Sequence, residues 1–259
     1  MVGYLRDFPL VIFLVSLFAL WLSAQAGVYL RKKFRAVEEE ERKDLATLEA
    51  ATLTLLGLIV AFSFSMAITR YDLRKAYEAN EANAIGTEYN RAGLLPENDR
   101  DAVRHLLEQY VLQRVAFYET RREADLQEIN DATDHLEAEL WSRVQKVAAS
   151  QPTPPIALVA IGMNNVLDNR GYTQAAWWNR IPSAAWDLMV AIAILCNVLV
   201  GYGAYRSGAY LFIVLPLALS ISFLLISDLD SPRGGVIRVV PHNLVSLAQT
   251  LELQRADRK

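Results

Sequence analysis

The sequence is poor in the residues that build disulfides, metal clusters and hydrolytic triads. Its 259 residues include one cysteine and three histidines. The cysteine, Cys196, cannot form a disulfide within the chain, and its apolar surroundings predict a small buried side chain. The histidines lie in separate segments, and the spacings of zinc sites, nucleophile elbows and P-loops do not occur. The sequence therefore predicts no catalytic set and no cofactor, and we do not expect an enzyme.

An excess of positive charge is also missing. The chain has 26 Lys and Arg against 29 Asp and Glu, which gives a net charge of −3. A protein that binds nucleic acid through its phosphates needs a basic surface. Nucleic acid is therefore not an expected partner.

Charge is distributed very unevenly along the chain. Residues 70 to 180 hold 13 of the 26 basic and 17 of the 29 acidic residues, whereas several stretches elsewhere have almost none. A helix rises about 1.5 Å per residue, so a stretch of roughly twenty apolar residues crosses the hydrocarbon core of a bilayer, which is about 30 Å thick. We infer a membrane protein with a polar insert.

Four membrane spans follow from this pattern. Residues 8 to 30 contain no charge, and residues 46 to 69 contain only Glu49, near one end. Residues 184 to 204 and 208 to 226 form the third and fourth spans, and the three residues between them predict an antiparallel hairpin. Four spans place both termini on the same side of the membrane as the insert.

The insert and the tail are predicted to be helical. The pattern of the second span continues over residues 71 to 92, and Pro96 opens a new helix with apolar residues at three-to-four spacing. Further helices are expected at 131 to 149 and 156 to 167, and a last one begins at Pro241. The predicted fold is all-α, a four-helix transmembrane protein with a helical cytoplasmic bundle between the second and third membrane helices.

This pattern divides the chain into four segments and suggests an orientation. The segments are a pair of membrane helices (1–69), the insert (70–182), a membrane hairpin (183–227) and a tail (228–259). Basic residues near the membrane ends divide almost evenly between the two sides. Because the charged insert has no export signal of its own, we predict a multi-pass protein of the cell (inner) membrane with the insert and both termini in the cytoplasm.

The second span carries a stripe of small and hydroxylated side chains. On a helical wheel its members fall within about 40° of one direction, and they are Thr47, Ala51, Thr54, Leu58, Ala61, Ser65, Thr69 and Asp72. Small residues let helices approach closely in lipid, which makes the stripe a candidate helix contact. Alternatively, the stripe lines a water-filled path that Phe62 or Met66 narrows to a hydrophobic constriction. The sequence alone leaves both readings open.

Acidic residues at the membrane boundary are the weakest candidates for a site. Asp228 and Asp230 follow the fourth span and could bind a divalent cation, although such acids more often end a span and are solvated. Asp187, near the start of the third span, is expected to be interfacial and paired with Arg180.

Two runs of sequence resemble a known family. Residues 55 to 100, LLGLIVAFSFSMAITRYDLRKAYEANEANAIGTEYNRAGLLPENDR, and residues 228 to 239, DLDSPRGGVIRV, resemble the bestrophin-like family of bacterial membrane proteins. Residues 61 to 76 are also similar in layout to the second membrane helix of bestrophins. Bestrophins are pentameric ion channels with four membrane helices, cytosolic termini and a large helical cytosolic part between the second and third helices.

The resemblance implies a central pore surrounded by the second span, with Ile59, Phe62 and Met66 in its neck. Combined with the stripe, the candidate pore-lining residues are Leu58, Ile59, Phe62, Ser65, Met66 and Thr69, and those of the inner mouth are Arg70, Tyr71 and Asp72. Tyr71 and Asp72 stand where bestrophins carry a tryptophan pair, and Asp228 and Asp230 at most echo their calcium-binding acids. Ion selectivity and calcium gating therefore do not transfer.

Passive ion conduction by a homo-oligomer, a pentamer by resemblance, is the leading hypothesis, with membrane lipids and inorganic ions as partners. The alternative is a non-conducting membrane scaffold or sensor. In that case the insert would bind a cytosolic partner and the stripe would serve only for helix packing.

Overall fold

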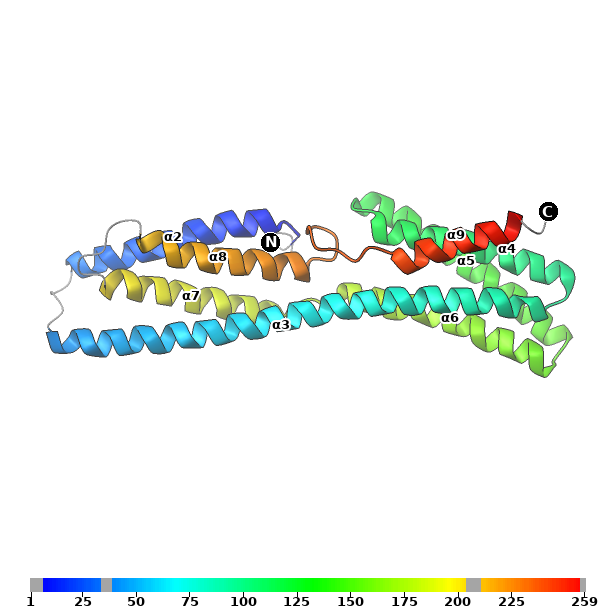
Figure 1. Cartoon of the computed structure of the whole chain (residues 1–259), viewed down its shortest axis with the longest axis horizontal. Helices are drawn as coiled ribbons and strands as arrows, with labels where there is room; N and C mark the ends of the chain where they lie inside the picture. Colours follow the sequence, from blue (N-terminus) through cyan, green and yellow to red (C-terminus); the bar gives the residue numbers. More distant parts are fainter. Residues whose placement is uncertain (1–6, 34–38, 204–210, 257–259) are drawn as a thin grey trace. The chain divides into compact units, whose positions relative to one another are not determined.

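The computed structural model describes residues 7–33, 39–203 and 211–256, and these residues form helices and short connections without any strand (Figure 1). The helices are α2 (Pro9–Lys33), α3 (Glu39–Arg91), the 3-10 helix η1 (Ala92–Leu94), α4 (Glu97–Glu119), α5 (Glu123–Ser150), α6 (Pro154–Trp178), α7 (Ser183–Gly203), α8 (Leu211–Asp230) and α9 (His242–Ala256). The prediction of an all-α fold is confirmed.

Four helical stretches are long and apolar enough to cross a membrane, as predicted. They lie within Pro9–Lys33, Lys43–Leu94, Pro154–Gly203 and Phe212–Asp230. The second stretch belongs to α3, which has 53 residues and continues well beyond the predicted span. The predicted hairpin connection at 205–207 lies outside the described residues.

The chain forms two compact units. Unit 1 comprises Met1–Tyr71 and Arg180–Arg238, and unit 2 comprises Asp72–Asn179 and Val239–Lys259. The first part of α3 belongs to unit 1 and its last part to unit 2. Each unit has its own core.

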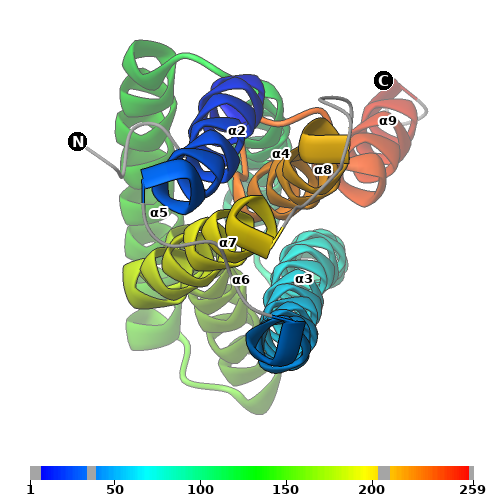
Figure 2. The same ribbon diagram turned by 90° about the vertical axis from the view of Figure 1, so that its left-hand side faces the viewer.

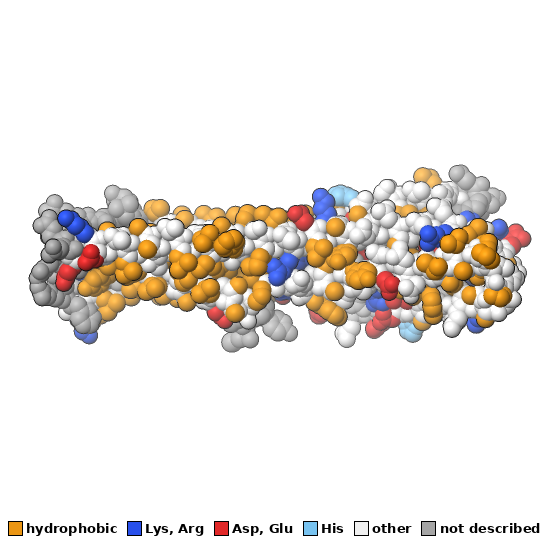
Figure 3. Space-filling view, turned by 90° about the horizontal axis from the view of Figure 1, so that it is seen from below, with side chains coloured by type: hydrophobic (Ala, Val, Ile, Leu, Met, Phe, Trp, Pro, Cys, Tyr) orange, Lys and Arg blue, Asp and Glu red, His pale blue; other side chains and the backbone are white. Residues whose placement is uncertain are grey.

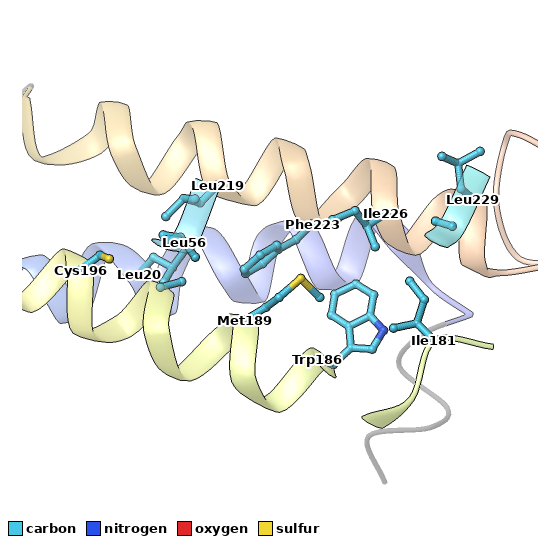
Figure 4. Packing of buried hydrophobic residues seen from close by; sticks show 12 residues of the cluster. Leu20, Leu56, Ile181, Trp186, Met189, Cys196, Leu219, Phe223, Ile226 and Leu229 are labelled. Atoms are coloured by element: carbon cyan, nitrogen blue, oxygen red, sulfur yellow. The ribbon is translucent and has the colours of Figure 1, made fainter. Parts of the chain in front are cut away.

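Unit 1 is a bundle in which α2 packs against both α7 and α8 (Figure 2). Its core contains side chains from α2, α3, α7 and α8 and from the segment before α7 (Figure 4). The members are Leu20, Leu56, Ala67, Ile181, Trp186, Met189, Ala193, Cys196, Leu219, Phe223, Ile226 and Leu229. Cys196 is buried there, as its apolar surroundings predicted.

Two glycines allow α2 and α7 to approach closely. A Cβ at Gly27 would collide with the Val198 carbonyl oxygen, and one at Gly201 would collide with the Ala24 carbonyl oxygen. Helices in lipid gain little from hydrophobic contact with one another and depend on close packing, for which small residues are needed. The crossing of α2 and α7 therefore requires glycine at both positions.

The outer surface of unit 1 is largely apolar. Large hydrophobic side chains of α2, such as Leu10, Leu14 and Phe18, are more than half exposed. Hydrophobic side chains cover much of the left-hand part of the view in Figure 3. A soluble surface rarely exposes so many large apolar residues together, and lipid is the solvent that suits them.

Unit 2 contains the rest of α3 with η1, α4, α5, α6 and α9. α4 packs against α5 and α9, and α5 packs against α6. In α9, Leu244 and Leu251 are buried and Leu247 is half-buried, so the predicted apolar face packs inward.

The prediction for α6 was too short, because the helix extends to Trp178 rather than ending near residue 167. Asparagine side chains interrupt the apolar pattern there but are satisfied within the helix. Asn164 Nδ2 donates to Asp168 Oδ2 at 2.9 Å, and Asn169 Nδ2 donates to the Asn165 carbonyl at 2.7 Å. These local hydrogen bonds let a polar stretch remain helical.

Candidate functional site

The polar stripe of α3 is uncovered in the single chain. All eight of its predicted members, from Thr47 to Asp72, are exposed. The opposite face of the same helix carries Leu56, Ser63 and Ala67, which are at most 2% exposed. Unit 1 thus packs the other side of α3 inward and leaves the stripe free for water, lipid or a second copy of the chain.

The predicted pore-lining residues divide between the two faces. Leu58 and Phe62 are 52% and 61% exposed, and Ser65 and Thr69 are exposed as well. Ile59 and Met66 are half-buried and pack against the unit 1 core. Of the two residues considered for a constriction, Phe62 projects from the exposed surface, whereas Met66 helps to fix α3 to its own bundle.

Hydroxyl groups of the stripe bond to their own helix. Thr54 Oγ1 donates to the Ala50 carbonyl at 2.8 Å, and Thr69 Oγ1 donates to the Ser65 carbonyl at 2.9 Å. Such bonds satisfy the hydroxyl hydrogen and leave the oxygen lone pairs directed outward. The stripe therefore offers weakly polar acceptors in an otherwise apolar span.

The three residues predicted at the inner mouth have different environments. Arg70 is half-buried, and its Nη1 donates to the Met66 carbonyl at 3.4 Å. Tyr71 packs against the unit 1 core, and Asp72 is exposed. Only Asp72 therefore presents a charge directly on the stripe.

Asp228 and Asp230 hold backbone groups in the structure. The Asp228 carboxylate accepts the N–H groups of Val236 and Ile237, both at 2.7 Å, and Asp230 Oδ1 accepts that of Ile181 at 2.9 Å. The described residues contain no group of three or more His, Cys, Asp and Glu placed to bind a metal ion. These contacts give both acids a structural role at the end of α8.

The expected pairing of Arg180 with Asp187 is wrong. Arg180 Nη2 lies 2.7 Å from Asp7 Oδ1, which also accepts a hydrogen bond from Ser231 Oγ at 3.1 Å. Asp187 is exposed near the start of α7. Sequence proximity favoured Asp187, but the fold brings the segment before α2 to Arg180 instead.

In unit 2, α3 buries charge and exposes amides. Its buried face includes Arg74, Glu78, Glu81 and Glu88, none more than 1% exposed. Its exposed face carries uncharged residues at helical spacing, namely Ala76, Asn80, Asn83, Thr87 and Asn90. This distribution is the reverse of that on an ordinary amphipathic helix, which keeps its charges in water.

Glu81 is the centre of a buried polar network. Its carboxylate forms an ion pair with Arg114 of α4 and accepts hydrogen bonds from Tyr118 and Thr173 at 3.3 and 3.2 Å. Burial raises the pKa of the Tyr118 phenol well above its ordinary value, and the charge of Glu81 raises it further. The network ties α3 to α4 and α6.

Glu78 joins α3 to the last helix. Its Oε1 accepts the backbone N–H groups of Asn243 and Leu244 at 2.9 and 3.0 Å, and its Oε2 accepts Asn243 Nδ2 at 2.6 Å. The carboxylate thus satisfies free donors in the first turn of α9 and interacts favourably with the helix dipole. Sequence analysis missed these acids, although their three-to-four spacing with Ile85 was a signal of one buried face.

Comparison with known proteins identifies the class to which this architecture belongs. Crystal structures of a bacterial bestrophin homologue from Klebsiella pneumoniae share the fold. One, of a variant with tryptophan replaced by alanine, has a TM-score of 0.65 at 13% identity over 95% of this chain and 96% of that chain. Another, solved by Zn-SAD phasing, has a TM-score of 0.61 at 15% identity over 92% and 95%. The chain is thus a membrane protein with the bestrophin fold.

A family model assigns the chain more closely. The model of the bestrophin-like domain matches residues 17–244, and the chain belongs to that family. No curated protein matches it. The resemblance seen in the two sequence runs is therefore confirmed.

Proposed function

We propose that the protein is a homo-oligomeric ion channel whose pore is lined by the exposed stripe of α3. The observation that supports it is the contrast between two exposed membrane surfaces of unit 1. α2 exposes large apolar side chains, whereas α3 exposes, beside large side chains such as Leu58 and Phe62, a row of small and hydroxylated ones. Lipid chains favour the first kind of surface, and a water-filled path or a neighbouring helix favours the second.

The assembly proposed is a ring, with five subunits by resemblance to bestrophins. In it, Leu58, Phe62, Ser65 and Thr69 line the pore, and Asp72 lies at its inner mouth. Ile59 and Met66 support the lining from behind, because they pack against the core of their own subunit. The insert and both termini are proposed to be cytoplasmic and the protein to lie in the cell membrane.

Flux through liposomes tests this proposal. Phe62→Ala should raise ion flux several-fold over the unaltered protein, because it removes a large exposed side chain that borders the stripe. Phe18→Ala is the matched control, since Phe18 is also 61% exposed but lies on α2. It should leave flux unchanged.

Two outcomes would count against the channel. Background flux from all three proteins would favour the membrane scaffold or sensor, with the stripe used only for packing. An equal rise in Phe18→Ala and Phe62→Ala would indicate leakage from a damaged bundle. The number of subunits, measured by mass photometry on the same samples, must exceed one for an axial pore to exist.

A further inference from the structure

A polar groove lies between α3 and α6 in unit 2. Its volume is about 340 Å³, and its lining is made of Asn80, Asn83, Ala84, Thr87, Arg91, Asn165 and Asn169. Carboxamides and a hydroxyl dominate this lining. Among the described residues, Arg91 is the one charged group in it.

Arg91 has its hydrogen-bonding capacity available. It is half-buried, and within the described ranges it makes no ion pair or hydrogen bond. On the α6 side of the groove, Asn165 accepts a hydrogen bond from Asn169 through its Oδ1 at 3.3 Å, which leaves the Asn165 Nδ2 group as a donor. A guanidinium with nearby amide donors is suited to an anion, because every group can donate to it.

Glu88 lies directly beside this charge. Its side chain is 0% exposed, and in the described part of the chain neither carboxyl oxygen has a hydrogen-bond partner. A Cβ at Gly162 of α6 would collide with both Glu88 Oε2 and Arg91 Nη1. The carboxyl group and the guanidinium therefore converge on one point of α6, where the absence of a side chain makes room for them.

The protonation of Glu88 decides the net charge at this point. Burial raises the pKa of Glu88 to about 8, and the charge of Arg91 partly opposes that rise. Among the described residues, Arg91 is the charged group that shifts the pKa of Glu88. On α6, Gly162 faces Glu88 without a side chain. Arg104 of α4 donates to the Tyr89 carbonyl at 3.3 Å. With Glu88 neutral, Arg91 is uncompensated, and with Glu88 ionised, the two charges cancel.

We propose that the groove between α3 and α6 binds a small inorganic anion on Arg91, and that protonation of Glu88 makes this site available. A cation finds no acidic group in the lining, and a neutral ligand would not respond to the charge of Glu88. The proposal does not depend on whether the chain conducts ions.

Bromide is a suitable probe, since it is a compact anion that can be located by anomalous scattering. Its apparent Kd is measured from the rise in Tm of the full-length protein in detergent, with gluconate holding the ionic strength constant. If only the form with neutral Glu88 binds, the apparent Kd should rise about tenfold between pH 7 and pH 9. Crystals soaked at pH 7 should show a bromide peak beside Arg91.

Three variants separate the roles of the groups. Glu88→Gln should bind bromide with the same Kd at both pH values. Arg91→Gln should lose the bromide-dependent rise in Tm. Arg143→Gln is the control for lost positive charge, because Arg143 forms an exposed pair with Glu139 on α5. It should behave as the unaltered protein does.

Several results would overturn the proposal. They are a bromide effect that persists in Arg91→Gln, an apparent Kd of the unaltered protein that does not change with pH, and an anomalous peak found only elsewhere. The soaked crystals of the unaltered protein also decide the matter if a groove variant does not fold.

Discussion

Replacing Glu88 by glutamine should change how the stability of the protein depends on pH. The ordinary pKa of a glutamate is 4.5, and burial raises that of Glu88 to about 8 in the folded chain. Between these values the folded protein keeps a proton that the unfolded chain has lost. Stability due to this group is therefore fully present below about pH 4.5 and is lost as pH rises toward 8.

The size of the effect follows from the shift. Each pH unit inside this window lowers the free energy of unfolding by about 1.4 kcal/mol. From pH 5 to pH 7 the loss amounts to about 3 kcal/mol, an upper value because water and Arg91 can reach an ionised Glu88. For a chain of this length, it corresponds to a fall in Tm of roughly 5 to 10 °C.

Thermal unfolding in detergent at pH 5, 6, 7 and 8 measures this directly. Glutamine keeps the shape of the side chain but does not titrate, so the Tm of Glu88→Gln minus that of the unaltered protein should grow across the series. A constant offset from the buried amide does not affect this slope. Glu97→Gln, at a side chain that is 82% exposed, should show no such growth.

Parallel pH profiles for Glu88→Gln and the unaltered protein would refute the reasoning. They would mean that the carboxyl group is ionised throughout, held by Arg91 or by water that enters between α3 and α6. The anion site proposed above would then lose its dependence on Glu88.

Two further predictions concern packing and loop anchoring in unit 1. Gly201→Ala places a methyl against the Ala24 carbonyl oxygen and should destabilise the protein by about 1–3 kcal/mol. Gly171→Ala is the control, because a Cβ there meets nothing within 4 Å, and it should be neutral or slightly stabilising. Equal Tm values for the two variants would contradict the close crossing of α2 and α7. Asp228→Asn leaves one side-chain oxygen to accept the backbone N–H groups of Val236 and Ile237. It should lower the free energy of unfolding by about 1–3 kcal/mol and speed hydrogen exchange at these two amides. Asp168→Asn on the surface of α6 is the control and should change neither stability nor exchange. Unchanged exchange would show that Asp228 does not anchor the loop.

The membrane part of the fold could be predicted because its signal is local. A run of uncharged residues long enough to cross a bilayer has few alternatives, and the absence of proline in residues 71 to 92 predicted that the second span continues as one helix. The family could be recognised because one of the runs that carry the resemblance concentrates several structural contacts within a short stretch of sequence. In the run DLDSPRGGVIRV, both aspartates accept backbone N–H groups. Its two glycines lie at close approaches, because a Cβ at Gly234 would collide with the Asp7 carbonyl oxygen and one at Gly235 with that of Asp228.

The polar core of unit 2 could not be predicted in the same way. Periodicity assigns a helix face by its apolar residues, so it gave no reason to expect Glu78, Glu81 and Glu88 to be buried. Their partners lie far along the chain, as Thr173 does from Glu81. Only the fold shows that these acids are enclosed, and the same long-range pairing explains why Asp7 rather than Asp187 binds Arg180.

The two faces of α3 bear on the proposed assembly. In a cyclic oligomer, a residue on the axial face meets copies of itself, so a charge at that position is repeated in every subunit and repels its equivalents. The exposed face of α3 is free of such charges from Thr47 to Thr69 in unit 1 and from Ala76 to Asn90 in unit 2. In unit 2, Glu78 and Glu81 are instead buried with partners of their own subunit, as Glu81 is with Arg114. This distribution keeps charge off the surface through which α3 would meet its copies, and Asp72 is the exception.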